Sequence, residues 1–164
     1  MLMTLCETGT RGLIGAFFGP ASKGEPDYAH DPVGHLTSDM LLLADRAFDS
    51  NRLLVDIAAQ GAQFLIRATT VRRPPVLALL PDGSYLTRIG DLSLRVIEAE
   101  VRSRTADGGA FGGTYRLLTT LTDPSSDPPT TWCISTTSVG RSRSHTWRSV
   151  TPCSRGESCV RRTR

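Results

Sequence analysis

LLLADRAFDS, residues 41–50, is the stretch that decides the fold of this chain. Four apolar residues precede Asp45, and residues suited to a helix start follow it from Asp49 onward. A short apolar run that ends in a polar residue is typical of a buried strand in a parallel or mixed sheet. The pattern predicts that Asp45 lies at the edge of a sheet. Two interpretations stay open, because such an acid can bind a ligand, or can pair with Arg46 and cap the next helix.

The clearest helix in the sequence follows this strand. Ser50 can cap its start, and Leu53 and Ile57 fall on one face. Gly61 stands where a helix favours a left-handed terminal residue. Residues 63–68 then form a second apolar run. A strand, a helix and a strand joined by short connections make a right-handed crossover with parallel strands, so the sequence predicts an α/β core.

The stretches on both sides of this unit predict further elements. Residues 2–18 suit one or two strands that bend near Gly9 and Gly12. Residues 25–36 begin like a helix, but Pro32 interrupts the pattern, so this helix should be short or kinked.

A β-rich stretch follows the core and predicts a small antiparallel sheet. Two pairs of apolar runs each flank a polar turn, and the runs are residues 76–80, 85–89, 92–101 and 114–121. Arg72 and Arg73 join this stretch to the core. They allow two interpretations, contact with phosphates or a solvated linker, and short charge runs are more often the second.

The chain of 164 residues is long enough for one domain with a hydrophobic core. It contains no run of about 18 apolar residues and no basic segment followed by an apolar one at its start, so we expect a cytoplasmic protein with no membrane partner. The formal charge of +3 is unevenly divided. Residues 1–124 hold 12 basic and 14 acidic side chains, whereas residues 125–164 hold 7 and 2.

The last 40 residues differ from the rest in composition. They contain no leucine, and 23 of them are Ser, Thr or Arg. The spacing of Cys133, Cys153 and Cys159 does not suit a structural zinc site, which needs ligands paired two to four residues apart. We therefore predict a basic tail over residues 125–164 that is irregular or disordered.

Four blocks of the sequence stand in a fixed order: ETGTRGLIGAFFGP, LLLADRAFDSNRLL, GAQFLIRATTVRRPPVLALLPDGSYLTRIG and YRLLTTLTDP. Taken together they resemble the middle of bacterial insertion-sequence transposases of the DDE type, in the family numbered four. The resemblance runs from about residue 6 to about residue 124, so residues 1–124 are expected to form a partial transposase DDE domain. It implies a ribonuclease-H-like core fragment at residues 1–70, which is a mixed sheet with helices, and a β-rich insertion with its return strand at residues 71–121.

The resemblance also implies an activity, DNA strand cleavage and transfer in DNA transposition. The DNA that it implies as a partner is the ends of an insertion sequence. It also allows the chain to assemble as a homo-oligomer. The family uses three carboxylates that hold two divalent cations, Mg²⁺ or Mn²⁺. Asp45 matches the second carboxylate and is the candidate catalytic and metal-binding residue. The first belongs on a strand upstream of Met1, and neither Glu7 nor Asp27 has its sequence context.

The third carboxylate belongs to a helix motif Y-x-x-R-x-x-x-E, which the tail contains only in another reading frame. If the codons from Trp132 to Val160 are shifted by one base, the permitted residues include LVHLYHERWKIEVAYLALRHTLLEGRVLR, a leucine-rich amphipathic helix with the acid at position 143. This chain has Arg143 there, and a guanidinium cannot bind a cation. We therefore predict a one-base shift near codons 125–128.

The expected product is a transposase fragment that is catalytically inactive by itself. Two alternatives remain at this stage. The chain could be a non-catalytic DNA-binding or regulatory fragment, or an unstable product whose uncovered sheet edges invite aggregation.

Overall fold

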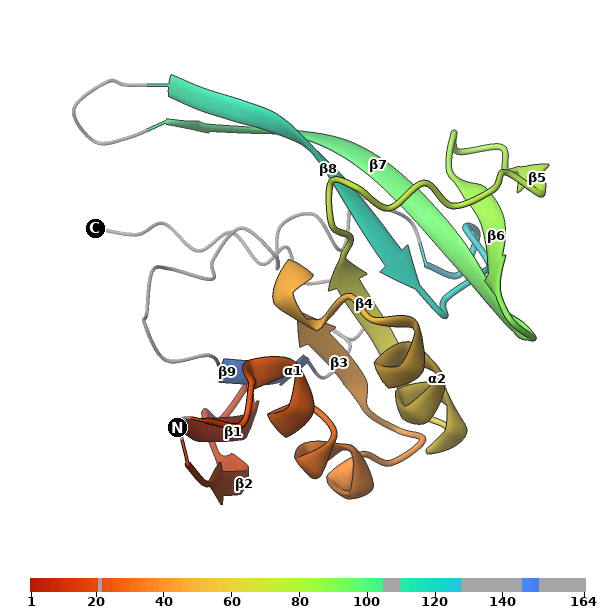
Figure 1. Cartoon of the computed structure of the whole chain (residues 1–164). Coiled ribbons are helices and arrows are strands. Elements are labelled where there is room, and N and C mark those ends of the chain that lie inside the picture. Colours follow the sequence, from red (N-terminus) through yellow and green to blue (C-terminus); the bar gives the residue numbers. More distant parts are fainter. Residues whose placement is uncertain (21, 105–109, 128–145, 151–164) are drawn as a thin grey trace.

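The computed structural model describes residues 1–20, 22–104, 110–127 and 146–150, with side chains over 1–20, 22–98 and 115–127. A nine-stranded sheet runs through the molecule in the order β2-β1-β9-β3-β4-β8-β7-β6-β5 (Figure 1). Two neighbouring pairs, β1 with β9 and β3 with β4, are parallel, and the other pairs are antiparallel. The predicted α/β class with a mixed sheet is confirmed.

The N-terminal residues form two strands, β1 (Leu2–Glu7) and β2 (Leu13–Phe18), with a turn at the expected place, and the strands pair as an antiparallel hairpin. The Glu7 carboxylate closes its turn by accepting the backbone N–H groups of Gly9 at 2.7 Å and Thr10 at 2.6 Å. The predicted interrupted helix is also confirmed. It consists of α1 (Glu25–Tyr28) and the 3-10 helix η1 (Asp31–His35).

The crossover predicted around Asp45 is present. Its elements, in chain order, are β3 (Leu41–Ala44), the 3-10 helix η2 (Arg46–Phe48), α2 (Asn51–Ala59) and β4 (Gln63–Arg67). Ser50 caps α2, because its Oγ accepts the Leu53 N–H at 3.2 Å. Gly61 follows the helix with φ of 79°, a left-handed conformation that glycine adopts without steric cost. The parallel pairing of β3 with β4 follows from this connection.

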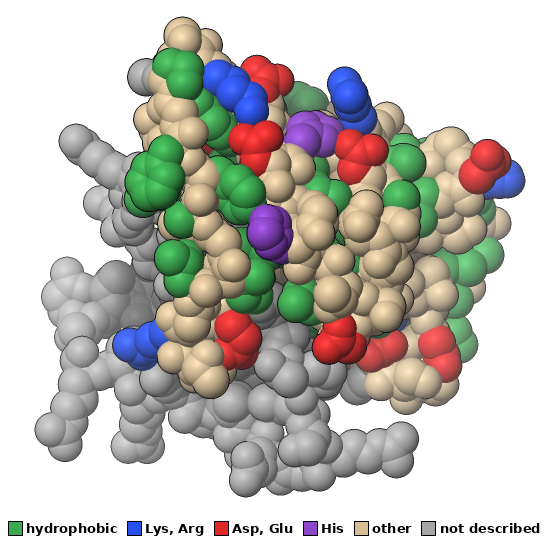
Figure 2. Space-filling model, turned by 90° about the horizontal axis from the view of Figure 1, so that it is seen from below, with side chains coloured by type: hydrophobic (Ala, Val, Ile, Leu, Met, Phe, Trp, Pro, Cys, Tyr) green, Lys and Arg blue, Asp and Glu red, His purple; other side chains and the backbone are tan. Residues whose placement is uncertain are grey.

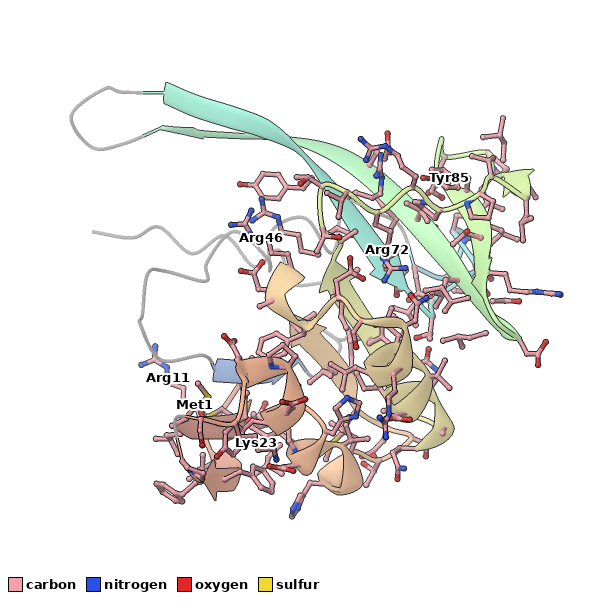
Figure 3. All side chains as sticks on the ribbon, in the orientation of Figure 1. Met1, Arg11, Lys23, Arg46, Arg72 and Tyr85 are labelled. Carbon is pink, nitrogen blue, oxygen red and sulfur yellow. The ribbon has the colours of Figure 1, made fainter. Side chains whose placement is uncertain are left out.

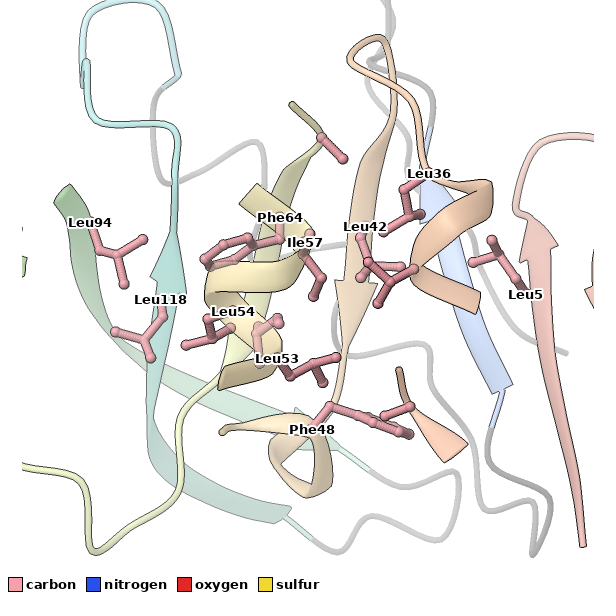
Figure 4. Packing of buried hydrophobic residues seen from close by; sticks show 14 of the residues in the cluster. Leu5, Leu36, Leu42, Phe48, Leu53, Leu54, Ile57, Phe64, Leu94 and Leu118 are labelled. Carbon is pink, nitrogen blue, oxygen red and sulfur yellow. The ribbon is translucent and has the colours of Figure 1, made fainter. Parts of the chain in front are cut away.

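One hydrophobic cluster joins the helices to the sheet (Figure 4). Leu53, Leu54 and Ile57 of α2 are buried in it together with Leu42 of β3 and Phe64 of β4. Full burial of one such side chain contributes roughly 1.5–3 kcal/mol relative to exposure. The apolar face of α2 therefore holds the crossover against the sheet.

The β-rich stretch forms four strands, which are β5 (Ala78–Leu79), β6 (Tyr85–Ile89), β7 (Leu92–Arg104) and β8 (Ala110–Thr119). They were predicted as a small antiparallel sheet added to the core, and they join the core sheet itself. The reason is that β8 pairs antiparallel with β4 and its end is tied there, since the Thr119 hydroxyl donates to the Phe64 carbonyl at 2.7 Å. Figure 1 shows β7 and β8 as a long hairpin that projects from the core.

Strands β5 to β8 form a β-rich arm, and a buried polar cluster closes its inner end. The Arg95 side chain is fully buried. Its Nε donates to the Ser84 hydroxyl at 2.8 Å, its Nη1 donates to the Asp127 carbonyl at 2.8 Å, and its Nη2 pairs with the Asp82 carboxylate. The cluster fastens the β5–β6 turn to the segment that follows β8.

Five residues of the tail depart from the prediction of irregular structure. They form β9 (Thr146–Val150), which lies between β1 and β3, parallel to the first and antiparallel to the second. Both neighbouring strands have inner edges whose N–H and C=O groups need partners, which is a physical reason for a strand at this position. The rest of the expectation, including Trp132, Cys133 and Arg143, falls at residues 128–145 and 151–164, outside the described part of the chain.

Helices are short in this protein. The longest helix among the described residues, α2, has nine residues. Within those residues no helix combines the length and the apolar character needed to cross a membrane.

Candidate functional site

Asp45 directly follows β3 and lies at the carboxyl edge of the sheet, next to the end of the parallel strand β4. Its Oδ1 accepts the Arg46 backbone N–H at 2.7 Å and so caps η2. The capping interpretation is therefore observed. The side chain is still 54% exposed, so a second interaction with a ligand is sterically open. A catalytic role for Asp45 stays a prediction.

Arg67 ends β4 and stands beside Asp45. Its Nη1 lies 3.9 Å from the Asp45 Oδ1, at the outer limit of an ion pair. The guanidinium carbon lies 4.0 Å from the ring centroid of Tyr115 on β8, which is a cation–π contact. The aromatic ring therefore orients Arg67, and the carboxylate contributes less because both charged groups face solvent.

A hollow of about 190 Å³ opens next to this pair. Its lining includes Arg46, Arg67, Arg73, Arg116, Thr69 and Tyr115. The Arg116 charge is balanced, because its Nη2 lies 2.7 Å from the Glu98 Oε1. Within the described residues, neither Arg46 nor Arg73 forms an ion pair. Figure 3 shows Arg46 extending from the edge near the end of β3. The surroundings of Asp45 are therefore cationic.

Arg72 has a different role from its neighbour Arg73. Its Nη2 lies 2.7 Å from the Oδ1 of Asp49, a carboxylate with no exposed side-chain surface. The two atoms do not meet with hydrogen-bond geometry, so this is a charge contact, and the Arg72 Nη1 donates a regular bond to the Asn51 Oδ1 at 2.8 Å. The Asp49 Oδ2 also accepts the Thr69 N–H at 2.7 Å. Arg72 is therefore not a solvated linker residue, since it ties the connection after β4 to the start of α2.

The arrangement does not fit a divalent cation held by the described residues alone. Those residues contain no group of three His, Cys, Asp or Glu side chains close enough to share a metal ion. Asp49, the next acid after Asp45, is buried against Arg72. A cation at Asp45 would therefore meet one carboxylate and two arginines, an environment in which like charges repel it.

Charge is distributed unevenly over the molecule. The face seen from below carries more Asp and Glu than Lys and Arg among its described side chains (Figure 2). Arg46 and Arg72 lie toward the upper part of the view in Figure 3. The edge that carries Asp45 is thus the more favourable place for an anion.

The sequence pointed to Asp45 but not to Arg67 and Tyr115, which lie beside it. One signal was available, because Arg67 ends the strand that was predicted to be parallel to β3, and the carboxyl ends of parallel strands meet at one edge of a sheet. No comparable signal pointed to Tyr115, because it reaches the site through the pairing of β8 with β4, which joins residues far apart in sequence.

Comparisons with known proteins add no relative. No family model matches the chain, and no curated protein matches it.

Proposed function

We propose that this chain is a fragment of a DDE-type insertion-sequence transposase that binds DNA and does not cleave it by itself. The observation that carries the proposal is an exposed carboxylate, Asp45, at the carboxyl edge of β3, among arginines that can bind phosphates. Its position fits the second acid of the family. Its surroundings suit a polyanion better than a free cation.

The sheet order supports the finer assignment to a ribonuclease-H-like core. In such a core a central strand has an antiparallel hairpin on one side and a parallel pair on the other. Here β1 and β2 form the hairpin, β3 and β4 form the pair, and one strand lies between them. The intervening strand of that fold runs parallel to the pair, whereas β9 runs antiparallel to β3.

The strand between β1 and β3 bears on the proposed loss of activity. The resemblance places the family's first carboxylate on a strand upstream of Met1, so no residue of β9 corresponds to it. The sequence of β9 is TWRSV, which contains no acid. β9 therefore supplies no carboxylate in place of the family's first acid.

Divalent cations supply two effects in this family when they are bound, activation of the attacking hydroxyl or water and stabilisation of the leaving oxygen. Asp45 would be one of their ligands. The described residues hold no group of three His, Cys, Asp or Glu side chains that could share a metal ion, and a hard dication with few carboxylate ligands is only weakly bound. We therefore expect Mg²⁺ and Mn²⁺ to bind no better to this chain than to its Asp45→Asn variant.

The first experiment measures binding and cleavage together. The purified chain is titrated into a labelled duplex that carries insertion-sequence ends, and into a supercoiled plasmid with Mg²⁺ or Mn²⁺. The expected result is salt-dependent binding of the duplex and an intact plasmid. Metal-dependent nicking that disappears in Asp45→Asn would overturn the inactivity, and a lack of binding at physiological salt would overturn the DNA-binding function.

The second experiment tests the origin of the tail. The nucleotide sequence around codons 125–128 should place the Y-x-x-R-x-x-x-E motif in the neighbouring frame. If the locus encodes residues 125–164 with no such motif in any frame, the frameshift is wrong.

A regulatory function is the second candidate. The site keeps the arginines that can bind DNA, while the described residues lack the carboxylates needed to cut it. A chain of this kind can occupy insertion-sequence ends or form mixed oligomers with an intact transposase. The expected result is a decrease in strand transfer by the intact enzyme when this chain is added in excess, and an unchanged rate would exclude this role.

A further inference from the structure

A second hollow adjoins the edge of the sheet that carries Asp45. It has a volume of about 540 Å³ and lies between the connection 69–75 and the turn that joins β6 to β7. Arg72 and Arg73 line it from the core, and Arg88 and Gly90 line it from the arm. Thr69 and Arg73 border this hollow and also the smaller one beside Asp45, so the two are contiguous.

The larger hollow is cationic. Its lining holds three arginines and no Asp or Glu. Arg72 is neutralised by the buried Asp49. Arg73 and Arg88 are exposed, and neither takes part in an ion pair within the described part of the chain. Asp91 lies in the same turn as Arg88 without forming an ion pair to it in these residues.

Rigid segments hold both arginines. Arg88 lies on β6 and pairs in register with Ser93 of β7, so its backbone belongs to the sheet. Arg73 precedes two prolines, which restrict it to extended conformations. Its Nη1 donates to the backbone carbonyl of Arg72 at 3.2 Å and to that of Thr70. The two arginines therefore extend from backbone that is held in place on two different parts of the fold.

We propose that the two hollows form one track for a DNA backbone, from Arg46 past Arg73 to Arg88, so that the β-rich arm holds the same DNA as the core. The identity of the ligand rests on the proposed function. A track that spans two hollows fits a polymer with regularly spaced phosphates, and a free phosphate ion would occupy only one of them. Each arginine that contacts a phosphate releases counterions, which makes the affinity depend on salt.

The test is the salt dependence of binding to a labelled duplex oligonucleotide, followed by fluorescence anisotropy. In Arg88→Gln we expect weaker binding and a slope of log K against log salt that is smaller by about 0.9, the contribution of one phosphate contact. Arg88→Lys keeps the charge and should restore most of the slope. Arg11→Gln is the matched control, because it removes one charge from the β1–β2 turn, which Figure 3 shows far from Arg72.

The outcomes separate this inference from the proposed function. If the unmodified chain binds the duplex and Arg88→Gln has the same slope as the unmodified chain, the arm does not contact the DNA and the track is wrong, while the proposed function stands. If Arg11→Gln lowers the slope as much as Arg88→Gln, binding is diffuse and the track is also wrong. If the unmodified chain does not bind the duplex, both are wrong.

Discussion

Two pairs of aspartate and arginine occupy different regions of this molecule, the Asp82–Arg95 pair at the inner end of the arm and the Asp45–Arg67 pair at the sheet edge. Arg95 has no exposed side-chain surface and Asp82 is 21% exposed. Arg67 and Asp45 are 33% and 54% exposed, and their charged atoms are 3.9 Å apart. The first pair is closed to solvent on the arginine side, and the second is open.

The difference shows how burial separates structural from available charge. Arg95 uses three of its nitrogen atoms on partners within the fold. Removing one member of a buried pair leaves the other charge desolvated, which costs several kcal/mol, whereas an exposed pair contributes little. The residue types are the same in both pairs, so the environment alone assigns their roles.

The largest effect should come from Arg95→Met. The substitution removes the partner of the Asp127 carbonyl and of the Asp82 carboxylate, and we expect the free energy of unfolding to fall by about 2–3 kcal/mol, the upper range for hydrogen bonds to charged groups. Urea denaturation followed by circular dichroism measures it. The control is Arg46→Met, which removes the same charge from an exposed position and should change stability by less than about 0.5 kcal/mol. Equal stability of the two variants would remove the distinction between the pairs.

Loss of the buried Asp49 carboxylate should also destabilise the fold, as loss of Arg95 does. Asp49→Ala removes the partner of Arg72 and the acceptor of the Thr69 N–H. We expect a loss of about 2 kcal/mol in the free energy of unfolding, from the unsatisfied groups that remain. Asp91→Ala, an exposed acid in the β6–β7 turn, is the control and should be near neutral in the same urea experiment. A neutral Asp49→Ala would show that the tether to α2 does not stabilise the fold.

The pH dependence of stability should also distinguish the buried pair. Burial raises the pKa of the Asp82 carboxyl, but the hydrogen bonds from Ser84 and the Arg95 charge outweigh it, so the pKa lies below its usual value of 3.8. A lowered folded-state pKa gives stability that is present above the unfolded-state pKa and is lost as pH falls through the folded-state pKa.

The stability difference between the unmodified chain and Asp82→Asn should therefore be constant from pH 7 to about 5 and shrink below about pH 4. Thermal unfolding at a series of pH values measures it. The Asp127 carboxyl acts in the opposite direction, because burial raises its pKa, so the comparison is best made in the Asp127→Asn background. A difference that grows as the solution is acidified would contradict the sign.

The smallest effect on stability should come from Asp45→Asn. The exposed pair with Arg67 contributes within about 0.5 kcal/mol. Removing one negative charge from a cationic edge should nevertheless strengthen binding to duplex DNA at low salt. Thermal unfolding and anisotropy on the same variant check both parts. A large loss of stability would place Asp45 with the structural acids and weaken its assignment as a site residue.

Much of the fold follows from local patterns in the sequence. The run of four apolar residues before Asp45, the Ser50 cap and Gly61 predicted the crossover. The strands at the N-terminus and the bend near Gly9 and Gly12 were also predicted. Hydrophobic periodicity and turn chemistry act over a few residues, so they can be read without the tertiary structure. The position of Asp45 at a sheet edge follows from the same local information.

Only the tertiary structure decided which charged residues lie close together and which of them are paired within the fold. Arg72 and Arg73 are adjacent in sequence, yet one is tied to buried Asp49 and the other is exposed. The pairing of β8 with β4 brings Tyr115 to Arg67 and makes the arm part of the core sheet. These contacts join residues distant along the chain, and burial, which sets the cost of a charge, is a property of the whole fold.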